Sequence, residues 1–133
     1  MRLLMVYCWN FSYKTSQRGL ESVKEFDEEK EFENALVGFI HVDPQDIAQL
    51  SDVVTKLIKN LKWTARKNKT QQFVLHSFAH LAESKANLED SKQILDLAQE
   101  RLRSAGYTAE QTPFGYFIDL QVNAHGNFFA RLY

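Results

Sequence analysis

The sequence predicts an α+β domain in which two amphipathic helices pack on a mixed β-sheet. Apolar strand-like segments alternate with two segments whose apolar residues recur every three or four positions. The 133 residues, 44% of them hydrophobic and 25% charged, suffice for one well-filled core. With two prolines, five glycines and no Pro-, Gly- or Ser-rich stretch, no linker is evident, so we expect a single domain over residues 1–133.

Two apolar segments predict the first strands of the sheet. Residues 3–11 have no turn residue before Asn10, and residues 35–42 have the composition of a central strand. Gly38 within the second segment indicates a bulge or a close backbone approach. Residues 21–34 between them are rich in acids, which favours a solvated connection with at most a helical turn.

Capping residues mark both predicted helices. Asp43 followed by Pro44 favours a helix start, and Asn87 and Gly106 favour the start and end of a helix over residues 87–105. One face of each helix is apolar. Its members are Ile47, Leu50, Val54, Leu57, Ile58 and Leu61 in the first helix and Ile94, Leu95, Ala98 and Leu102 in the second.

The remaining apolar segments predict four more strands, over residues 72–77, 107–111, 116–123 and 127–132. His125-Gly126 favours a hairpin turn between the last two. The predicted order is therefore β-β-α-β-α-β-β-β. The strands that flank each helix are expected to form right-handed parallel crossovers, which makes the sheet mixed.

Composition excludes several classes of protein. The single cysteine, Cys8, forms no internal disulfide, so we expect a reducing, cytoplasmic location. No apolar run approaches the ~18 residues that cross a bilayer, so no membrane partner is expected. Residues 1–9 lack a small-residue cleavage site and are interpreted as a strand. The net charge of −1 argues against coating nucleic acid by charge alone.

Few residues suggest chemistry by their spacing alone. His76 and His80 have the spacing of a metal site on a helix, but they follow a strand pattern without a third ligand, so hydrogen-bonded strand and loop residues are the favoured interpretation. Cys8 in an apolar strand is expected to be a small core residue. The sequence therefore predicts neither a metal nor a cofactor.

A basic stretch with one tryptophan, Trp63, follows the first helix. It can contact a phosphate backbone and offer one ring for stacking, or it can be a solvated helix end. Its expected nucleic-acid contacts are Lys62, Arg66, Lys67 and Lys69.

Four segments resemble the N-terminal editing domain of archaeal-type threonyl-tRNA synthetases, in the same order and over essentially the whole chain. They are Met1-Arg2-Leu3-Leu4, Leu36-Val37-Gly38-Phe39-Ile40, Phe78-Ala79-His80-Leu81 and Pro113-Phe114-Gly115-Tyr116. The resemblance implies the fold of D-aminoacyl-tRNA deacylases, a homodimer, and hydrolysis of serine mischarged on threonine tRNA. In the last strand, Phe128, Phe129 and Tyr133 are the expected dimer contacts.

The resemblance also implies a site. It would lie where residues 78–80 meet Val42 and residues 117–118, with His80 beside the substrate and Val42 and Ala79 as pocket walls. Phe78 and Tyr116 are further expected substrate contacts. Such a pocket must exclude threonine by size, because one methylene is worth only ~1–3 kcal/mol in a synthetic site.

The chain departs from the family's pattern at the polar end of the first strand, with Tyr7, Cys8 and Trp9, and at three positions nearer the C-terminus. Phe117 replaces a frequent tyrosine, Ile118 replaces a lysine expected to position water or stabilise charge, and Arg131 replaces a glutamate expected near the substrate's ammonium group. Two functions therefore stay open. One is an aminoacyl-tRNA deacylase that binds the aminoacylated 3′ end of tRNA, freestanding or attached to a synthetase body. The other is a catalytically degenerate relative that binds tRNA or a synthetase, or dimerises.

Overall fold

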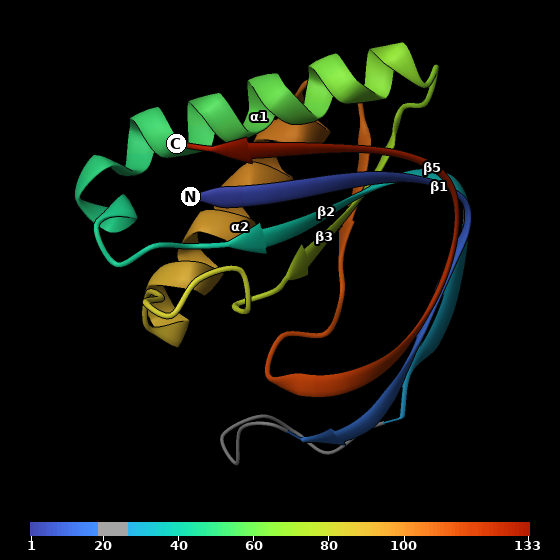
Figure 1. The fold of residues 1–133 in the computed structure, drawn as a ribbon, viewed down its shortest axis with the longest axis horizontal. Coiled ribbons are helices and arrows are strands. Elements are labelled where there is room, and N and C mark those ends of the chain that lie inside the picture. The colour runs from blue at the N-terminus through green and yellow to red at the C-terminus, as the bar shows by residue number, and fades with distance from the viewer. Residues whose placement is uncertain (19–26) are drawn as a thin grey trace.

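The computed structural model describes residues 1–18 and 27–133, which form a five-stranded sheet with helices packed on it (Figure 1). The strands lie in the order β4-β3-β2-β1-β5. The elements are β1 (Arg2–Arg18), β2 (Glu29–His41), η1 (Asp46–Gln49), α1 (Leu50–Lys67), β3 (Gln72–Ser77), α2 (Leu88–Ser104), β4 (Thr108–Gln111) and β5 (Tyr116–Leu132).

The pairing of the strands makes the sheet mixed. β2 and β3 are parallel, as are β3 and β4, whereas β1 is antiparallel to both β2 and β5. Both helices therefore connect parallel neighbours, which confirms the predicted fold class and the two crossover connections. In the described part of the chain, no helix is long and apolar enough to span a membrane.

Two apolar cores lie on opposite faces of the sheet. The larger core packs α1 and α2 against residues such as Leu36 and Leu75. The second core forms because the long strands β1, β2 and β5 bend strongly, as Figure 1 shows, so that Phe11 and Tyr13 share one cluster with Val74. Cys8 is fully buried in this cluster, and burial raises its pKa to about 11, so it is an inert core thiol as expected.

The predicted hairpin at His125-Gly126 is wrong. Residues 116–132 form one continuous strand that pairs along β1, and the ladder passes from Val6↔Phe128 to Cys8↔Ala124 with a register shift. A two-residue hairpin turn of the expected type needs positive φ angles, and Gly126 has none. The two residues therefore sit in a bulge, a feature that strengthens the bend of a strand.

The acidic segment also differs from the prediction. Residues 19–26 lie outside the described part, but Glu29–His41 is one strand, so the expected connection over residues 29–34 is wrong. Its glutamates are exposed, while Phe32 pairs with Phe11 and packs its ring 6.4 Å from that of Tyr13. An aromatic residue that faces inward between charged residues that face outward is the alternation of a half-buried strand. The many acids in this segment hid that strand pattern in the sequence.

The first helix starts later than predicted, because Asp43 has another partner. Regular α-helix begins at Leu50 after the short helix η1, and the Asp43 side chain does not cap it. One Asp43 oxygen instead accepts a 2.6 Å hydrogen bond from the buried N-terminal ammonium of Met1. Asp46 also lies 2.9 Å from that ammonium. The network joins the beginning of β1 to the segment that leads into α1.

The second helix matches its predicted signals. The Asn87 side chain accepts a 2.8 Å hydrogen bond from the backbone N–H of Asp90, and Gly106 has φ +93° after the last turn. The close approach expected at Gly38 is also present. A Cβ at Gly38 would lie 3.3 Å from Leu61 of α1, so glycine lets this helix pack closely on the sheet.

Replacing Asp43 with Asn is expected to lower the free energy of unfolding by about 3 kcal/mol, because it leaves a buried ammonium without its shortest ion pair. Burial alone would raise the pKa of Asp43, but the hydrogen bond and charge of the ammonium, helped by Arg2, lower it below its ordinary 3.8. Its contribution is thus present above pH 3.8 and is lost as the pH falls through the folded-state pKa.

Urea unfolding of Asp43→Asn at several pH values measures this effect. The matched control is Asp96→Asn, which breaks the exposed Lys92–Asp96 pair and should cost no more than about 0.5 kcal/mol. Equal losses in the two variants, or a gap from wild type that widens toward pH 3, would contradict the assignment.

Candidate functional site

A cavity of about 470 Å³ opens where the chain leaves β3 and where it enters β5. Six of the eight residues predicted for substrate and catalysis line it, and these are Phe78, Ala79, His80, Tyr116, Phe117 and Ile118. They come from two segments almost 40 positions apart in the sequence. The sequence of neither segment alone shows that the two segments meet at one cavity.

Three rings contact one another along the first segment. His76, Phe78 and His80 follow each other at every second position, with ring centroids 5.9 Å apart for the first pair and 5.0 Å for the second. The Phe78 N–H donates to the Ile40 carbonyl at 2.9 Å, so contact with β2 continues one residue past the end of β3. His76 is thus a hydrogen-bonded strand residue and His80 lies in the turn that follows, as favoured.

The second segment is a tight connection between β4 and β5. The Thr112 N–H donates to the Leu75 carbonyl at 3.1 Å, and the Thr112 hydroxyl lies 2.8 Å from His76 Nδ1. Gly115 has φ +88°, a conformation that glycine adopts without the steric cost that other residues incur. These contacts hold residues 112–116 against the end of β3.

A buried histidine fixes the loop that forms the other side of the cavity. The Leu81 N–H donates to His41 Nδ1 at 3.2 Å, so the ring hydrogen is on Nε2, which donates to the Ser84 carbonyl at 2.8 Å. The Ala86 N–H also donates to the Val42 carbonyl at 2.8 Å. Val42, predicted as a pocket wall, is buried in the larger core and anchors this loop through its backbone, without lining the cavity.

The cavity contains little charge. No carboxylate is among its described lining residues, and Lys85 is its one lysine or arginine there. Burial, and next the charge of His80, lower the pKa of His76 to about 4, so its imidazole is neutral at physiological pH. The site combines aromatic rings, two imidazoles and one cation.

Arg131 lies away from this cavity. Its side chain is on the helix-covered face of the sheet, where its guanidinium carbon is 5.3 Å from the centre of the Trp63 ring. The Trp63 ring also carries Lys67 over it at 4.5 Å and contacts Phe129 edge-on at 5.5 Å. The structure thus groups Arg131 with the basic residues of α1 and not with the predicted substrate contacts.

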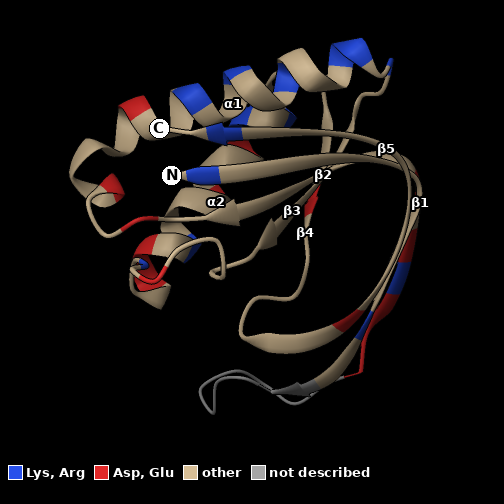
Figure 2. Ribbon diagram, in the orientation of Figure 1, with Lys and Arg blue, Asp and Glu red and all other residues tan. Residues whose placement is uncertain are grey.

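The basic residues form a separate surface along α1. Figure 2 shows Lys and Arg at regular intervals on this helix, whose sequence holds five of them against one aspartate. The cavity segment that leads into β5, orange in Figure 1, lies at the opposite side of the molecule. Lys62 contacts the Tyr107 ring at 5.7 Å, and Lys69 follows the helix with φ 55°.

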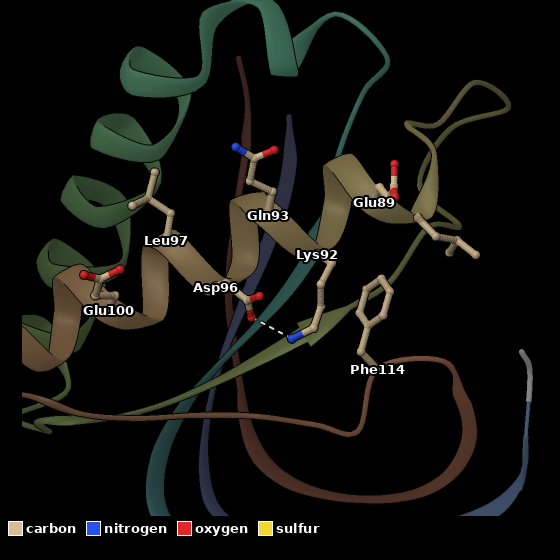
Figure 3. Close-up of a pocket in the computed structure, with 8 residues that line it drawn as sticks. Glu89, Lys92, Gln93, Asp96, Leu97, Glu100 and Phe114 are labelled. Carbon is tan, nitrogen blue, oxygen red and sulfur yellow. Dashed lines mark hydrogen bonds and ion pairs between the residues drawn. The ribbon is translucent and has the colours of Figure 1, made fainter. Parts of the chain in front are cut away.

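A second cavity, of about 670 Å³, runs along the outer side of α2 and meets the first at Leu88 and Phe114 (Figure 3). Lys92 lies near the Phe114 ring in this view and forms a 2.6 Å ion pair with Asp96. Glu89 and Glu100 add two more carboxylates. This acidic groove is unfavourable for a phosphate backbone, so a nucleic acid is expected to reach the site from another side.

The family comparison agrees with this architecture. The model of the archaea-specific editing domain of threonyl-tRNA synthetase matches residues 1–133. This chain belongs to that family. Its curated relatives include threonine–tRNA ligases of Thermofilum pendens, 28% identical over 134 residues, and of Thermococcus kodakarensis, 26% identical over 135 residues. Each match covers 99% of this chain but 22% of the relative, so the chain corresponds to about a fifth of those proteins.

A solved structure shares the fold. The c-Myc DNA unwinding element binding protein superposes with a TM-score of 0.73 over 100% of this chain and 99% of that one, at 12% sequence identity. At this identity the likeness establishes the fold alone, and it supports the expected D-aminoacyl-tRNA deacylase-like architecture. Membership of this editing-domain family assigns the chain to tRNA editing.

Three residues that shape the cavity were not among the predicted site residues. The sequence favours His76 as a hydrogen-bonded strand residue, and its two-residue spacing from Phe78 is the signal that could have placed it in the site. Thr112 and His41 gave no signal, because their partners are 36 and 40 or more positions away. Contacts of this kind depend on the tertiary fold.

Replacing Gly115 with Ala should strain the cavity segment. A side chain at φ +88° costs about 1 kcal/mol, which urea unfolding can measure. Gly106→Ala, at φ +93° with nothing within 4 Å of the added Cβ, is the control of equal backbone strain. Both variants should lose similar stability, but only Gly115→Ala should shift the amide resonances of residues 76–80. Matching shifts in both variants would refute the coupling between the two segments.

Proposed function

We propose that the protein hydrolyses mischarged aminoacyl-tRNA and removes serine from threonine tRNA. The observation that carries this proposal is the convergence of residues 78–80 and 116–118 on one cavity, in a chain that belongs to an editing-domain family. The long relatives are ligases, so this chain is proposed to act with a threonyl-tRNA synthetase body, either fused or separate.

The chemistry required is modest. A water oxygen attacks the ester carbonyl carbon, the π electron pair moves to the carbonyl oxygen, and the tetrahedral intermediate then collapses. The bond to the ribose oxygen breaks, that oxygen gains a proton derived from the water, and free serine leaves. The protein's part is to position the ester and the water and to stabilise the developing negative charge.

The residues of the cavity suit these tasks in different ways. Ala79 is a small wall residue, which fits a pocket that must reject the additional methyl group of threonine. Phe117, 58% exposed, and Phe78 offer rings on which a terminal nucleobase can stack. His80, exposed at the mouth, is proposed to contact the substrate beside the ester.

One observation favours a second candidate function, a non-catalytic module that binds tRNA or a synthetase. Ile118 occupies the position of the family's lysine, and the described lining of the cavity contains no carboxylate to hold the substrate's ammonium group. A binding module needs neither group. Measuring deacylase activity on this protein distinguishes the hydrolytic function from the binding module.

Deacylation of seryl-charged threonine tRNA is expected to fall in His80→Ala without being abolished, because the ribose hydroxyl and backbone donors remain. Ile118→Lys should raise the rate, since it adds a cation where negative charge develops. The control is Val122→Lys, which adds the same charge at an exposed position of β5 outside the cavity. A wild-type protein without activity that Ile118→Lys leaves inactive would favour the binding module.

The basic face of α1 is proposed to bind the tRNA backbone. It is defined by Lys62, Arg66, Lys67 and Lys69, and Arg131 lies beside it. Trp63 holds Lys67 and Arg131 near its ring, and such cation–π contacts restrict where the two charges can move. Although the net charge of the chain is −1, its positive charges gather on this face, where they can bind phosphate groups.

Arg66→Gln with Lys67→Gln should weaken tRNA binding and reduce the slope of log affinity against log salt concentration by about 2, one for each lost phosphate contact. Fluorescence titrations at several salt concentrations measure this slope. Lys92→Gln, which removes one positive charge on the acidic groove of α2, is the control and should leave the slope unchanged. An equal change in the control would show that net charge, and not this face, sets the affinity.

A homodimer is proposed as the assembly state. β5 is an edge strand, and Phe128 and Leu132 on it are 55% and 69% exposed, which leaves apolar surface for a partner to cover. Of the other expected contacts, Phe129 and Tyr133 pack against the larger core of their own chain. Phe128 is therefore the proposed dimer contact among the three.

A further inference from the structure

His76 has one imidazole nitrogen tied to the protein and one left for a ligand. Nδ1 lies 2.8 Å from the Thr112 hydroxyl, whereas Nε2 makes no hydrogen bond to any residue that the structure describes. His76 lines the same cavity as His80 and Ile118. A ring held at Nδ1, whose Nε2 has no hydrogen bond among the described residues, can present that atom to a substrate.

The orientation of the ring is fixed by its neighbours. Phe39 of β2 contacts it edge-on, with centroids 5.4 Å apart and an interplanar angle of 89°. The Phe78 ring lies 5.9 Å away on the same strand extension. Together with Thr112, these contacts come from three different segments, so the imidazole is held before any ligand arrives.

The charge state of His76 follows from its surroundings. Burial and the neighbouring His80 keep it neutral above about pH 4. The other titratable groups that line the cavity are Lys85 and Tyr116, and the described lining has no carboxylate that would favour the imidazolium. A neutral imidazole has one N–H donor and one acceptor nitrogen, and Thr112 decides which is which.

We propose that the Thr112 hydroxyl donates to His76 Nδ1, so that Nε2–H donates a hydrogen bond to the carbonyl oxygen of the aminoacyl ester. This inference rests on the proposed deacylase function. As the water oxygen bonds to the carbonyl carbon, the π pair moves to that oxygen, and the Nε2–H stabilises its negative charge without transferring the proton. When the ribose oxygen leaves, the pair returns to re-form the carbonyl bond.

The proposal gives His76 a task that Ile118 cannot perform. A lysine there would supply a cation for the developing charge, whereas an isoleucine supplies no donor. A neutral imidazole donor can polarise a carbonyl, and removing one oxyanion donor typically costs about 10²-fold or more in kcat. His76 is therefore predicted to act in the transition state more than in ground-state binding.

The tautomer is tested on the free protein, without any activity measurement. In ¹⁵N NMR between pH 6 and 8, Nε2 of His76 should carry the hydrogen and Nδ1 should have the shift of an unprotonated nitrogen. Thr112→Val should move the Nδ1 resonance toward that of a nitrogen without a hydrogen bond. A hydrogen on Nδ1, or an imidazolium in this range, would overturn the proposal.

Kinetics then test the role. His76→Phe, which keeps a ring against Phe39, should lower kcat for seryl-tRNA hydrolysis about 100-fold and change KM less than about threefold. His76→Gln restores an N–H donor and should recover at least about tenfold of that loss. His125→Phe, the same exchange at an exposed position on β5 outside the cavity, should behave as wild type. An undiminished kcat in His76→Phe would overturn the assignment.

A binding measurement separates this inference from the proposed function. The probe is a non-hydrolysable amide analogue in which serine is joined to 3′-amino-adenosine. Its titration should shift the Nε2 resonance of His76, and His76→Phe should weaken its binding several-fold. If the wild-type protein is inactive but these effects occur, the hydrolytic function fails and the donor assignment stands. If the analogue leaves Nε2 unchanged, the assignment fails whatever the activity.

Discussion

The attachment of the loop after β3 to the end of β2 holds the candidate site together. Three backbone N–H groups, of Phe78, Leu81 and Ala86, donate to the Ile40 carbonyl, His41 Nδ1 and the Val42 carbonyl. Because β2 and β3 are parallel neighbours, both strands end at the same edge, and the loop closes back across it. The segment before β5 is then fixed to β3 through Thr112, and the space between the two segments is the cavity.

Local signals predicted much of the fold. Apolar periodicity located most of α1, and periodicity together with the Asn87 cap located α2, because these signals depend on neighbouring residues. The hairpin and the acidic connection failed for a different reason. Whether Gly126 turns, or Phe32 faces inward, depends on pairing with β1, whose paired residues lie 21 positions from Phe32 and more than 100 from Gly126. Local composition does not encode that pairing.

Most, but not all, of the residues predicted for substrate and catalysis line the cavity. The resemblance located the two segments that form the cavity, since their motifs are contiguous in sequence. It could not show that Val42 acts through its carbonyl or that Arg131 lies across the sheet beside Trp63. The first depends on how the loop after β3 folds back onto β2, and the second on which face of β5 Arg131 occupies, which is set by pairing with β1. His76 gains its interest only from Thr112 and Phe39, which belong to other elements.

Hydrolysis of an aminoacyl ester in this cavity, with serine selected over threonine, can be tested in one experiment. It is single-turnover hydrolysis of threonine tRNA charged with serine or with threonine, with excess wild-type protein and with none. The protein should accelerate loss of the seryl ester and leave the threonyl ester close to its spontaneous rate. Spontaneous rates for both esters, or faster loss of threonine, would contradict this expectation.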